Sequence, residues 1–348
     1  MSVVLITGSS GLIGSETVSF FCEKGFDVIG LDNDYRKIFF GNISSTISVK
    51  NTLNKKFKNY KHINLDIRNN KGLIKIFKKY KKNIQLIIHS AAQPSHDYAK
   101  DFPLLDFDIN ARSTLNLLEL TKKYCFESPF IFMSTNKVYG DLPNYLNFKE
   151  NKTRYELETT DKNFNGIDEN FSIDKSIHSL FGVSKCYADL VVQEYGKNFG
   201  LKTVAMRAGC ITGPNHKGAK LHGFLSFLVK SCLKFKRYEI IGYKGKQVRD
   251  NLHANDLVRC FWEFFKKPKF GEVYNIGGGR LSNCSILEAI SLVEKSIRKE
   301  IKIKIKNKNR TGDHKWYISN TNKFKEHYPN WVQKFSTKKI IDEIIYNN

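Results

Sequence analysis

The sequence predicts an α/β protein in which a doubly wound parallel sheet is followed by a smaller α/β lobe. Three observations predict this fold. The 348 residues suffice for one large domain or two closely packed ones. The first half alternates apolar strands with amphipathic helices, which is typical of a parallel sheet covered on both faces. From about residue 208 the pattern changes to short helices, loops and one alternating strand, IKIKIK at 301–306.

The expected elements follow the chain in a regular order. Two polar stretches, 41–59 and 141–178, are predicted to be long loops. Helices are expected near 12–24, 70–81, 104–124 and 182–199. Strands are expected at 2–7, 27–32, 60–65, 84–90, 129–134, 202–207 and 272–276.

The change of pattern near residue 208 also predicts the division into domains. We expect a first domain at 1–207, to which residues 251–276 return with a further strand. The second lobe is expected at 208–250 and 277–348. The boundary is therefore predicted to be interleaved, so that the two parts cannot be separated by one cut of the chain.

Composition excludes several classes of protein. Hydrophobic residues make up 41% and aromatic residues 13%, as in globular chains. No stretch approaches the roughly 20 apolar residues that span a bilayer, so no membrane partner is expected. The seven cysteines are scattered and form no CxxC pair, which argues against a disulfide framework or a zinc site. We therefore expect a cytoplasmic protein without a metal.

The formal net charge of +23 is carried mainly by lysines that are spread over the whole chain. The densest runs, 75–82 and 299–308, fall on predicted solvated faces of a helix and a strand. A nucleic-acid binder usually gathers Arg and Lys on one surface, so we expect no nucleic-acid partner. Attraction to a polyanion stays open as an alternative, and an anionic small substrate fits the same field.

A glycine-rich segment, Thr7–Gly14 (TGSSGLIG), follows the first strand directly and opens a helix. Such glycines let the backbone turn tightly and approach a pyrophosphate, which rests on the helix N-terminus. Asp32 ends the second strand, where a carboxylate accepts hydrogen bonds from an adenosine ribose and repels a 2′-phosphate. The arrangement predicts a Rossmann-type domain that binds NAD. Arg36 leaves a small opening for NADP, and a structural turn without a cofactor is the other alternative.

The spacing of these glycines and the motifs that follow resemble the extended short-chain dehydrogenase/reductase family. Asp66-Ile67 follows the third strand, the segment 89–93 (HSAAQ) follows the fourth, and Asn110 lies in DINARSTLNLLE. The resemblance covers nearly the whole chain. It implies NAD as cofactor and a homodimer that pairs helices 104–124 and 182–199. The cofactor-binding residues that it implies are Gly8, Ser10, Gly11, Leu12, Ile13, Gly14, Asp32, Asn33, Asp66, Ile67, Ala91, Ala92, Gln93, Asn110 and Lys185.

The resemblance also implies a catalytic set, from which this chain departs at one position. The family uses a Ser or Thr, a Tyr and a Lys; the Tyr takes the proton of the sugar hydroxyl, and the Lys lowers its pKa. Thr135 and Lys185 match two of the three, but Phe181 stands at the tyrosine position. Phe has no ionisable oxygen, so another group must act if the chain is active. The candidates for this role are His178, which we choose first, Tyr187 and Tyr139.

The residues after Thr135 bear on the reaction. Relatives that dehydrate sugars carry Asp-Glu there, whereas this chain has Asn136-Lys137. The segments 134–145, 152–156 and 244–257 resemble members of the family that epimerise C2 of a CDP-linked sugar. This resemblance implies a nucleotide-sugar epimerase that works through a transient keto intermediate, in the biosynthesis of surface-polysaccharide sugars. A C4 epimerase and a non-catalytic binder of NAD and a sugar nucleotide remain alternatives.

A nucleotide-sugar partner is also implied by the second lobe. Arginines in QVRD and RTGD match those with which the family grips the diphosphate, because a guanidinium can bind phosphate oxygens in a bidentate manner. Surface salt bridges are the alternative reading of these arginines. The nucleotide base cannot be read from the sequence. The substrate-binding residues that we predict are Thr135, Asn136, Asn215, His216, Arg249 and Arg310.

Overall fold

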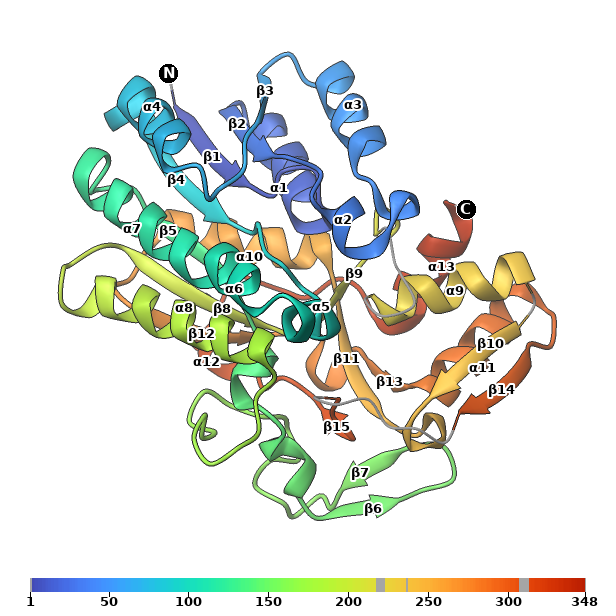
Figure 1. The fold of residues 1–348 in the computed structure, drawn as a ribbon. Coiled ribbons are helices and arrows are strands. Elements are labelled where there is room, and N and C mark those ends of the chain that lie inside the picture. The colour runs from blue at the N-terminus through green and yellow to red at the C-terminus, as the bar shows by residue number, and fades with distance from the viewer. Residues whose placement is uncertain (1, 217–222, 236, 307–312, 348) are drawn as a thin grey trace. The chain divides into compact units, whose positions relative to one another are not determined.

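Figure 1 shows the fold in a computed structural model, which describes residues 2–216, 223–235, 237–306 and 313–347. The chain divides into two compact units. The first unit comprises Met1–Thr135, Leu180–Arg207 and Leu257–Tyr274, and the second comprises Asn136–Ser179, Ala208–Asp256 and Asn275–Asn348. Residues 136–179 thus group with the second unit, whereas the sequence placed them in the first domain. The division of cofactor and sugar binding between two domains stays a prediction.

A seven-stranded sheet forms the centre of the first unit in the described part of the chain. Its order is β12-β8-β5-β4-β1-β2-β3, and β1 pairs in parallel with both β2 and β4. The predicted Rossmann-type doubly wound sheet is confirmed. Its strands are β1 (Val3–Thr7), β2 (Asp27–Asp32), β3 (Tyr60–Asn64), β4 (Ile84–His89), β5 (Phe130–Thr135), β8 (Thr203–Ala208) and β12 (Glu272–Ile276).

Helices cover both faces of this sheet (Figure 1). On one face, Leu73, Leu117 and Val192 belong to a core that also contains residues of the central strands. On the other face, the rings of Phe21 and Trp262 pack edge to face with centroids 6.1 Å apart. The first group of helices is α4 (Asn70–Tyr80), α7 (Ser113–Tyr124) and α8 (Leu180–Lys197), and the second is α1 (Leu12–Glu23) and α10 (Ala254–Lys266).

Two predictions for the first unit need correction. The stretch 41–59 is not a long loop, because it contains α3 (Ile47–Lys56), which buries Leu53 and packs on α1; a short helix, α2 (Arg36–Phe40), precedes it. Ile47, Val49 and Leu53 are its apolar residues, and their spacing of two and four leaves little periodic signal in the sequence. The single helix expected at 104–124 consists of α6 (Pro103–Phe107), a π-helical turn (Asp108–Arg112) and α7. The short helix α5 (His96–Asp101) comes before α6.

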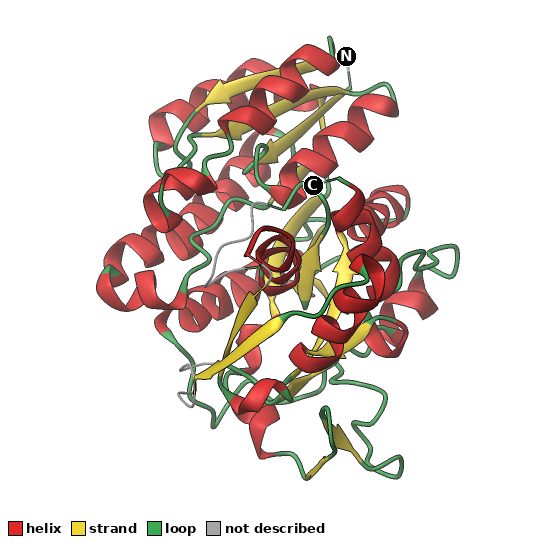
Figure 2. Ribbon diagram, turned by 90° about the vertical axis from the view of Figure 1, so that its right-hand side faces the viewer, coloured by secondary structure: helices red, strands yellow, loops and turns green. Residues whose placement is uncertain are grey.

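The second unit is built around β11 (Val248–His253), which is buried along its whole length. Its neighbours are β9 (Cys210–Thr212), β13 (Asn283–Ser285) and β15 (Trp316–Tyr317). The expected strand at 301–306 is present as β14 (Lys302–Lys306), paired in parallel with β10 (Arg237–Ile241). Three helices pack into one core of the second unit: α9 (Phe224–Phe235), α11 (Ile286–Ile297) and α13 (Thr337–Tyr346). The helix α12 (Asn322–His327) follows β15, and Figure 2 draws all helices in red.

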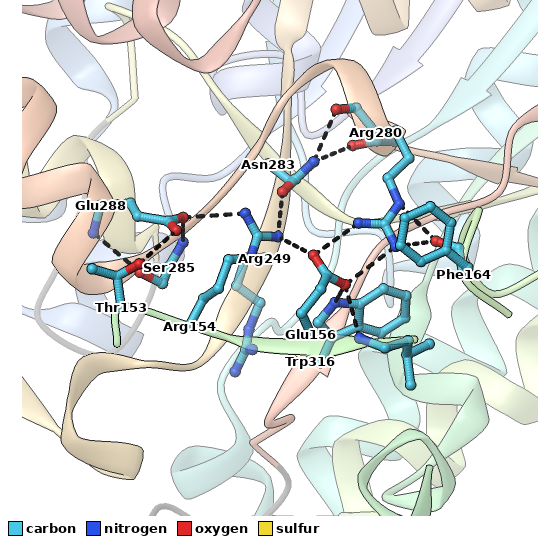
Figure 3. A network of polar contacts seen from close by, with 12 residues as sticks. Thr153, Arg154, Glu156, Phe164, Arg249, Arg280, Asn283, Ser285, Glu288 and Trp316 are labelled. Atoms are coloured by element: carbon cyan, nitrogen blue, oxygen red, sulfur yellow. Dashed lines mark hydrogen bonds and ion pairs between the residues drawn. The ribbon is translucent and has the colours of Figure 1, made fainter. Parts of the chain in front are cut away.

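The predicted loop 141–178 contains a small antiparallel hairpin of β6 (Phe148–Glu150) and β7 (Tyr155–Leu157). A polar network ties this hairpin to the rest of the second unit (Figure 3). The Glu156 carboxylate accepts a hydrogen bond from Trp316 Nε1 at 3.0 Å and forms ion pairs with Arg280 at 2.9 Å and Arg154 at 3.0 Å. Arg154 also reaches Glu288 at 3.3 Å. These contacts explain why residues 136–179 group with the second unit.

We expect Glu156→Gln to lower the free energy of unfolding by about 2–3 kcal/mol, because it leaves two partly buried guanidinium groups without their shared anion. The Glu156 side chain is 18% exposed. Glu158→Gln is the matched control on the same segment. The Glu158 side chain is 46% exposed and pairs with Lys149, so its loss should cost less than about 1 kcal/mol. Urea denaturation of both variants checks the difference, and equal midpoints would contradict it.

Candidate active site

The glycine-rich turn between β1 and α1 has the geometry of a cradle. Gly8 adopts φ +71°, and a Cβ there would lie 2.8 Å from the backbone nitrogen of Ala91. A Cβ on Gly14 would overlap the carbonyl group of Gly8. Gly11 donates its N–H to the Gly8 carbonyl at 3.1 Å and closes the turn. Side chains are therefore excluded from the place where the chain passes from strand to helix.

Polar groups around this cradle fit a dinucleotide. Ser10 donates its backbone N–H to Asp32 Oδ2 at 3.0 Å, which joins the turn to the end of β2. The Ser10 hydroxyl is buried without a hydrogen-bond partner, as expected of a group that takes a phosphate oxygen. Burial raises the pKa of Asp32, against the N–H groups of Asp34 and Ser10, which lower it. Leu12 and Ile13, which begin α1, stay partly exposed beside the turn.

A second group of polar side chains continues from Asp32 along the carboxyl ends of β2 and β3. Asn33 donates to Asp66 Oδ2 at 3.1 Å, and the Arg68 guanidinium pairs with the same carboxylate at 2.6 Å. Burial acts to raise the pKa of Asp66, but the bonds from Arg68 outweigh it and hold this pKa below its usual value. Ile67, which lies between Asp66 and Arg68 in the sequence, is buried. Asn33 and Asp66 are thus joined by a hydrogen bond, and cofactor binding by Asn33, Asp66 and Ile67 stays a prediction.

The turn after β4 lies against the glycine cradle. The His89 ring is held between two hydroxyls, Thr7 Oγ1 at 2.7 Å and Thr114 Oγ1 at 3.0 Å. Burial, and then the charge of Lys185, lower the pKa of His89 to about 3, so the ring is neutral. Ala91 donates its N–H to Thr7 Oγ1 at 3.2 Å, and Ala92 follows, partly exposed. His89 therefore fixes this turn.

Gln93 and Asn110, both predicted to contact the cofactor, belong to a buried network within the chain. Gln93 Nε2 donates to Asp106 Oδ1 at 2.7 Å, and Asn110 Nδ2 lies 2.9 Å from the same oxygen. Asn110 Nδ2 is also 3.2 Å from the hydroxyl of Ser184 on α8. Burial raises the pKa of Asp106, against hydrogen bonds from Ser184 and Gln93. The network ties the turn after β4 to α8, so these two residues position other groups.

Lys185 lies inside the first unit, close to the end of β5 where Thr135 stands. Its ammonium donates to the Met133 carbonyl at 2.6 Å and lies 4.0 Å from the centre of the Phe132 ring. Burial lowers the pKa of Lys185 to about 7, although Asp189 and Asp106 raise it. Thr135, the last residue of β5, is partly exposed. The structure thus places Lys185 beside the strand that carries Thr135.

A buried carboxylate that the sequence did not single out fixes α8. Asp189 accepts two bonds from the Arg207 guanidinium, at 2.9 and 3.1 Å, and one from the Ser134 hydroxyl at 2.5 Å. Arg207 closes β8 and Ser134 lies in β5. Lys185 is one helical turn from Asp189 on the same helix. The carboxylate therefore joins two strands to the helix that carries Lys185 and Phe181.

Phe181 and the three candidates for the role of the family's tyrosine lie in different surroundings. Phe181 is buried, and its ring meets that of His96 edge to face, with centroids 5.0 Å apart. His178 Nε2 lies 2.7 Å from the Val138 carbonyl, which gives this nitrogen a structural bond. The Tyr139 hydroxyl lies inside the second unit, 2.8 Å from Asn275 Oδ1. Tyr187 is exposed on α8, and its ring is tilted by 49° against that of Phe107, with centroids 5.7 Å apart.

The predicted substrate residues of the second unit differ in their surroundings. The Arg249 guanidinium is buried and pairs with Asp313 at 2.5 Å. His216 is buried and Asn215 exposed, next to each other after β9, and Asn136 is buried directly after β5. Arg310 lies outside the described residues. The Arg249 guanidinium is therefore already bound by a carboxylate of its own unit.

Sequence reasoning missed His96, Asp106 and Asp189. Asp106 precedes Asn110 by one helical turn, and this spacing was a usable signal for a polar pair on one helix face. Asp189 follows Lys185 by the same spacing. His96 carried no such signal, because its contact with Phe181 joins residues that lie far apart in the sequence.

Comparison with known proteins adds the family. Residues 4–277 match the model of the NAD dependent epimerase/dehydratase family. The chain belongs to this family. It is 34% identical over 298 residues to CDP-paratose 2-epimerase of Salmonella typhi, covering 84% of this chain and 83% of the relative. It is 29% identical over 295 residues to a putative UDP-glucose 4-epimerase of Methanocaldococcus jannaschii, covering 85% and 82%.

Solved structures agree with the epimerase/dehydratase fold. A dTDP-glucose 4,6-dehydratase from Bacillus anthracis, solved in complex with NAD, superposes with a TM-score of 0.78 at 22% identity, covering 100% of this chain and 96% of that chain. Membership in the epimerase/dehydratase family confirms the predicted resemblance, the fold, the enzyme class and NAD as cofactor. The glycine cradle, Ser10 and Asp32 are the residues of this chain that fit NAD. No helix in the described ranges has the length and apolar character needed to cross a membrane.

We expect Lys185→Met to change the pH dependence of stability. The folded pKa of about 7 lies below the ordinary 10.5, so folding disfavours the ammonium form. Between these values the unfolded wild type binds the proton and the folded one does not, so wild-type stability rises with pH. The stability of Lys185→Met relative to wild type should therefore decrease as pH rises from about 7 to 10.

The measurement is urea denaturation of NAD-free protein at several pH values. Lys197→Met is the matched control, because Lys197 is exposed at the end of the same helix. Parallel stability profiles for Lys185→Met and wild type would contradict a buried, partly neutral Lys185.

Proposed function

We propose that this chain is an NAD-dependent nucleotide-sugar epimerase that inverts C2 of a CDP-linked sugar. The observation that carries the proposal is the combination of an intact NAD cradle, Thr135 and Lys185 with Asn136-Lys137 after the hydroxyl residue. The 34% identity to CDP-paratose 2-epimerase over most of both chains supports the choice of nucleotide and carbon. A cytoplasmic location and a place in surface-polysaccharide biosynthesis are expectations that follow from the proposed function.

The residues would share the reaction in the following way. Thr135, at the end of β5, would hydrogen-bond to the reacting hydroxyl and orient it. Lys185 would hold the nicotinamide ribose from the neighbouring helix. Bound NAD supplies a two-electron acceptor that takes a hydride from the sugar carbon and later returns it. Inversion requires that the keto sugar presents its other face to Thr135 before the hydride returns.

The residues after Thr135 argue against a dehydratase. Elimination of water from a sugar needs an acid and a base that move protons at neighbouring carbons. Asn136 cannot exchange a proton near neutral pH, and it is buried. Lys137 offers no carboxylate. This supports a reaction in which the sugar carbon is oxidised and reduced without further proton transfers.

Two other functions have specific observations in their favour. The relative with 29% identity is a putative UDP-glucose 4-epimerase, which favours C4 as the carbon inverted. Phe181 favours a protein that binds NAD and a sugar nucleotide without turnover, because Phe cannot take a proton.

We expect the purified protein to contain NAD and to convert a CDP-sugar into its C2 epimer. The bound nucleotide is identified by mass spectrometry. CDP-, UDP-, GDP- and dTDP-sugars are then incubated in D2O and analysed by NMR. The product should retain its original hydrogen at C2, because the hydride is shuttled internally. Lys185→Met should give no product.

The alternatives give different results in the same experiment. Inversion at C4 would favour the second function, deuterium at C2 would indicate deprotonation instead of hydride transfer, and binding without any product would favour the non-catalytic protein.

The homodimer that pairs helices 104–124 and 182–199 stays a prediction, and the structure shows which apolar residues of these helices are exposed. Leu118 is fully buried and cannot contact a second copy, whereas Leu115 and Val191 are partly buried against the core. The outer side of α8 nevertheless shows apolar side chains at helical spacing, and α6 adds two more beside it. These exposed residues are Leu180, Val183, Tyr187 and Leu190 on α8, and Leu104 and Phe107 on α6.

We propose that this apolar row pairs with the same row of a second copy. The double variant Val183→Asp, Leu190→Asp should then convert a dimer into a monomer at micromolar concentration, because it places charges in an apolar interface. Val332→Asp, at an exposed position of the second unit, is the control. Light scattering gives the mass of each, and a monomeric wild type would refute the dimer.

A further inference from the structure

The contact between His96 and Phe181 places an ionisable ring beside the position that lacks one. Phe181 stands where the family resemblance requires a tyrosine, and it is buried. The His96 ring meets it edge to face at 63°, with centroids 5.0 Å apart. Unlike Phe181, His96 is partly exposed. An imidazole that borders the tyrosine position and retains access to solvent has the chemistry that Phe181 lacks.

We propose that His96 is the proton carrier of this enzyme and takes the role that the family gives to tyrosine. The proposal rests on the proposed function, because it assumes that a sugar hydroxyl is oxidised next to Phe181. His96 would act directly on that hydroxyl, so it is a catalytic residue in the proposal.

The backbone around His96 is fixed by hydrogen bonds. Ser95 caps α5, with its hydroxyl accepting the Tyr98 N–H at 3.2 Å, so that His96 begins the helix. Gln93 binds both main-chain groups of Ser95: its Oε1 accepts the Ser95 N–H at 2.5 Å, and its Nε2 donates to the Ser95 carbonyl at 2.8 Å. Gln93 is fully buried. Three hydrogen bonds thus hold Ser95, the residue before His96.

The same network joins the turn before His96 to α8, the helix that carries Phe181. Gln93 reaches Asp106, Asp106 reaches Asn110, and Asn110 reaches Ser184, which lies three residues after Phe181. Helices α5 and α6 both pack against α8, and Figure 1 shows them side by side. A buried network that is fully satisfied makes such a geometry rigid. A catalytic base needs this kind of support from the residues around it.

The other candidates have bonds that serve the fold. His178 Nε2 is within hydrogen-bond distance of the Val138 carbonyl, a partner that only accepts, so this nitrogen carries its proton. The Tyr139 hydroxyl bonds to Asn275 Oδ1 in the buried interior of the second unit. Tyr187 points to Phe107 on the outer side of α8. The three candidates that the sequence suggested thus have contacts within the fold, and the ring that borders Phe181 is that of His96.

The proposed step balances as follows. The O–H bond of the sugar hydroxyl breaks, and its proton goes to a ring nitrogen of His96. The hydrogen on the same carbon leaves with its electron pair to NAD, and the C–O bond becomes a C=O bond. In the reverse step, the hydride returns to the other face of that carbon, and the imidazolium gives the proton back to oxygen. No other oxidant or base is needed.

The decisive variant is His96→Phe, which keeps an aromatic ring against Phe181 and removes the titratable nitrogen. The turnover number of the NAD-bound enzyme should fall by about 10²–10⁴-fold, as is typical when a general base is lost. KM for the sugar nucleotide and the NAD content should stay within a few-fold of wild type. A purely structural role of His96 predicts the opposite, because Phe preserves the packing. Wild-type turnover in His96→Phe would therefore overturn the proposal.

A second variant tests whether the missing group is a proton carrier. Phe181→Tyr places the phenol at its family position. In the His96→Phe background it should raise turnover by at least about tenfold, whereas in the wild-type background, where a carrier exists, it should change turnover little. An equal gain in both backgrounds would show that wild type lacks a carrier and would overturn the assignment to His96.

An NMR measurement and the activity of two proteins, wild type and His96→Phe, separate the failure of this assignment from the failure of the proposed function. In ¹⁵N-histidine-labelled holoenzyme, the ring signal that disappears in His96→Phe should shift on addition of the CDP-sugar that the wild type inverts. A wild type that inverts no sugar nucleotide refutes the proposed function and the role of His96 with it. A wild type that is active while His96→Phe is equally active refutes the role of His96 alone.

Discussion

The buried carboxylate of Asp189 is the constraint on which the first unit's chemistry depends. It binds Arg207 of β8 and Ser134 of β5, and it stands one turn after Lys185 on α8. Asp189 and Arg207 are almost completely enclosed, and such a pair is costly to break once one partner is lost. Because β5 ends at Thr135, this one carboxylate sets the helix with Lys185 and Phe181 against the strand with the hydroxyl residue. The positions of Thr135, Phe181 and Lys185 relative to one another depend on this carboxylate.

Around this constraint the site combines a glycine cradle with a phenylalanine, Phe181, at the position where the family resemblance implies a tyrosine. The glycines of the β1–α1 turn, the Ser10 hydroxyl and Asp32 satisfy what a dinucleotide requires. Phe181 carries no ionisable group and is buried on α8. His96 reaches the same ring from α5. In the proposed role of His96, the proton carrier lies on α5, whereas the family resemblance places it on α8.

Sequence reasoning gave the parallel sheet and the glycine cradle because both depend on local patterns. Strands such as Val3–Thr7 are continuous apolar runs, and the glycines have fixed spacing. The helix at 47–56 was missed because it buries only Leu53. The roles of Gln93 and Asn110 depend on Asp106 and Ser184, which meet them only in the folded chain. For the same reason, the contact of His96 with Phe181 could not be predicted, since the two residues lie far apart in the sequence.

The ion pair between Arg249 and Asp313 has a consequence for exchange of ligands. If Arg249 takes a diphosphate, as its motif suggests, the ligand must replace a carboxylate that is already bound at 2.5 Å. That competitor is attached to the chain, so its local concentration never falls. The free energy of binding then includes only the difference between the new ion pair and the old one. When the ligand leaves, the pair between Arg249 and Asp313 forms again at once. An enzyme whose substrate and product differ at a single carbon gains nothing from holding either tightly, and a resident carboxylate of this kind would hasten the release of both.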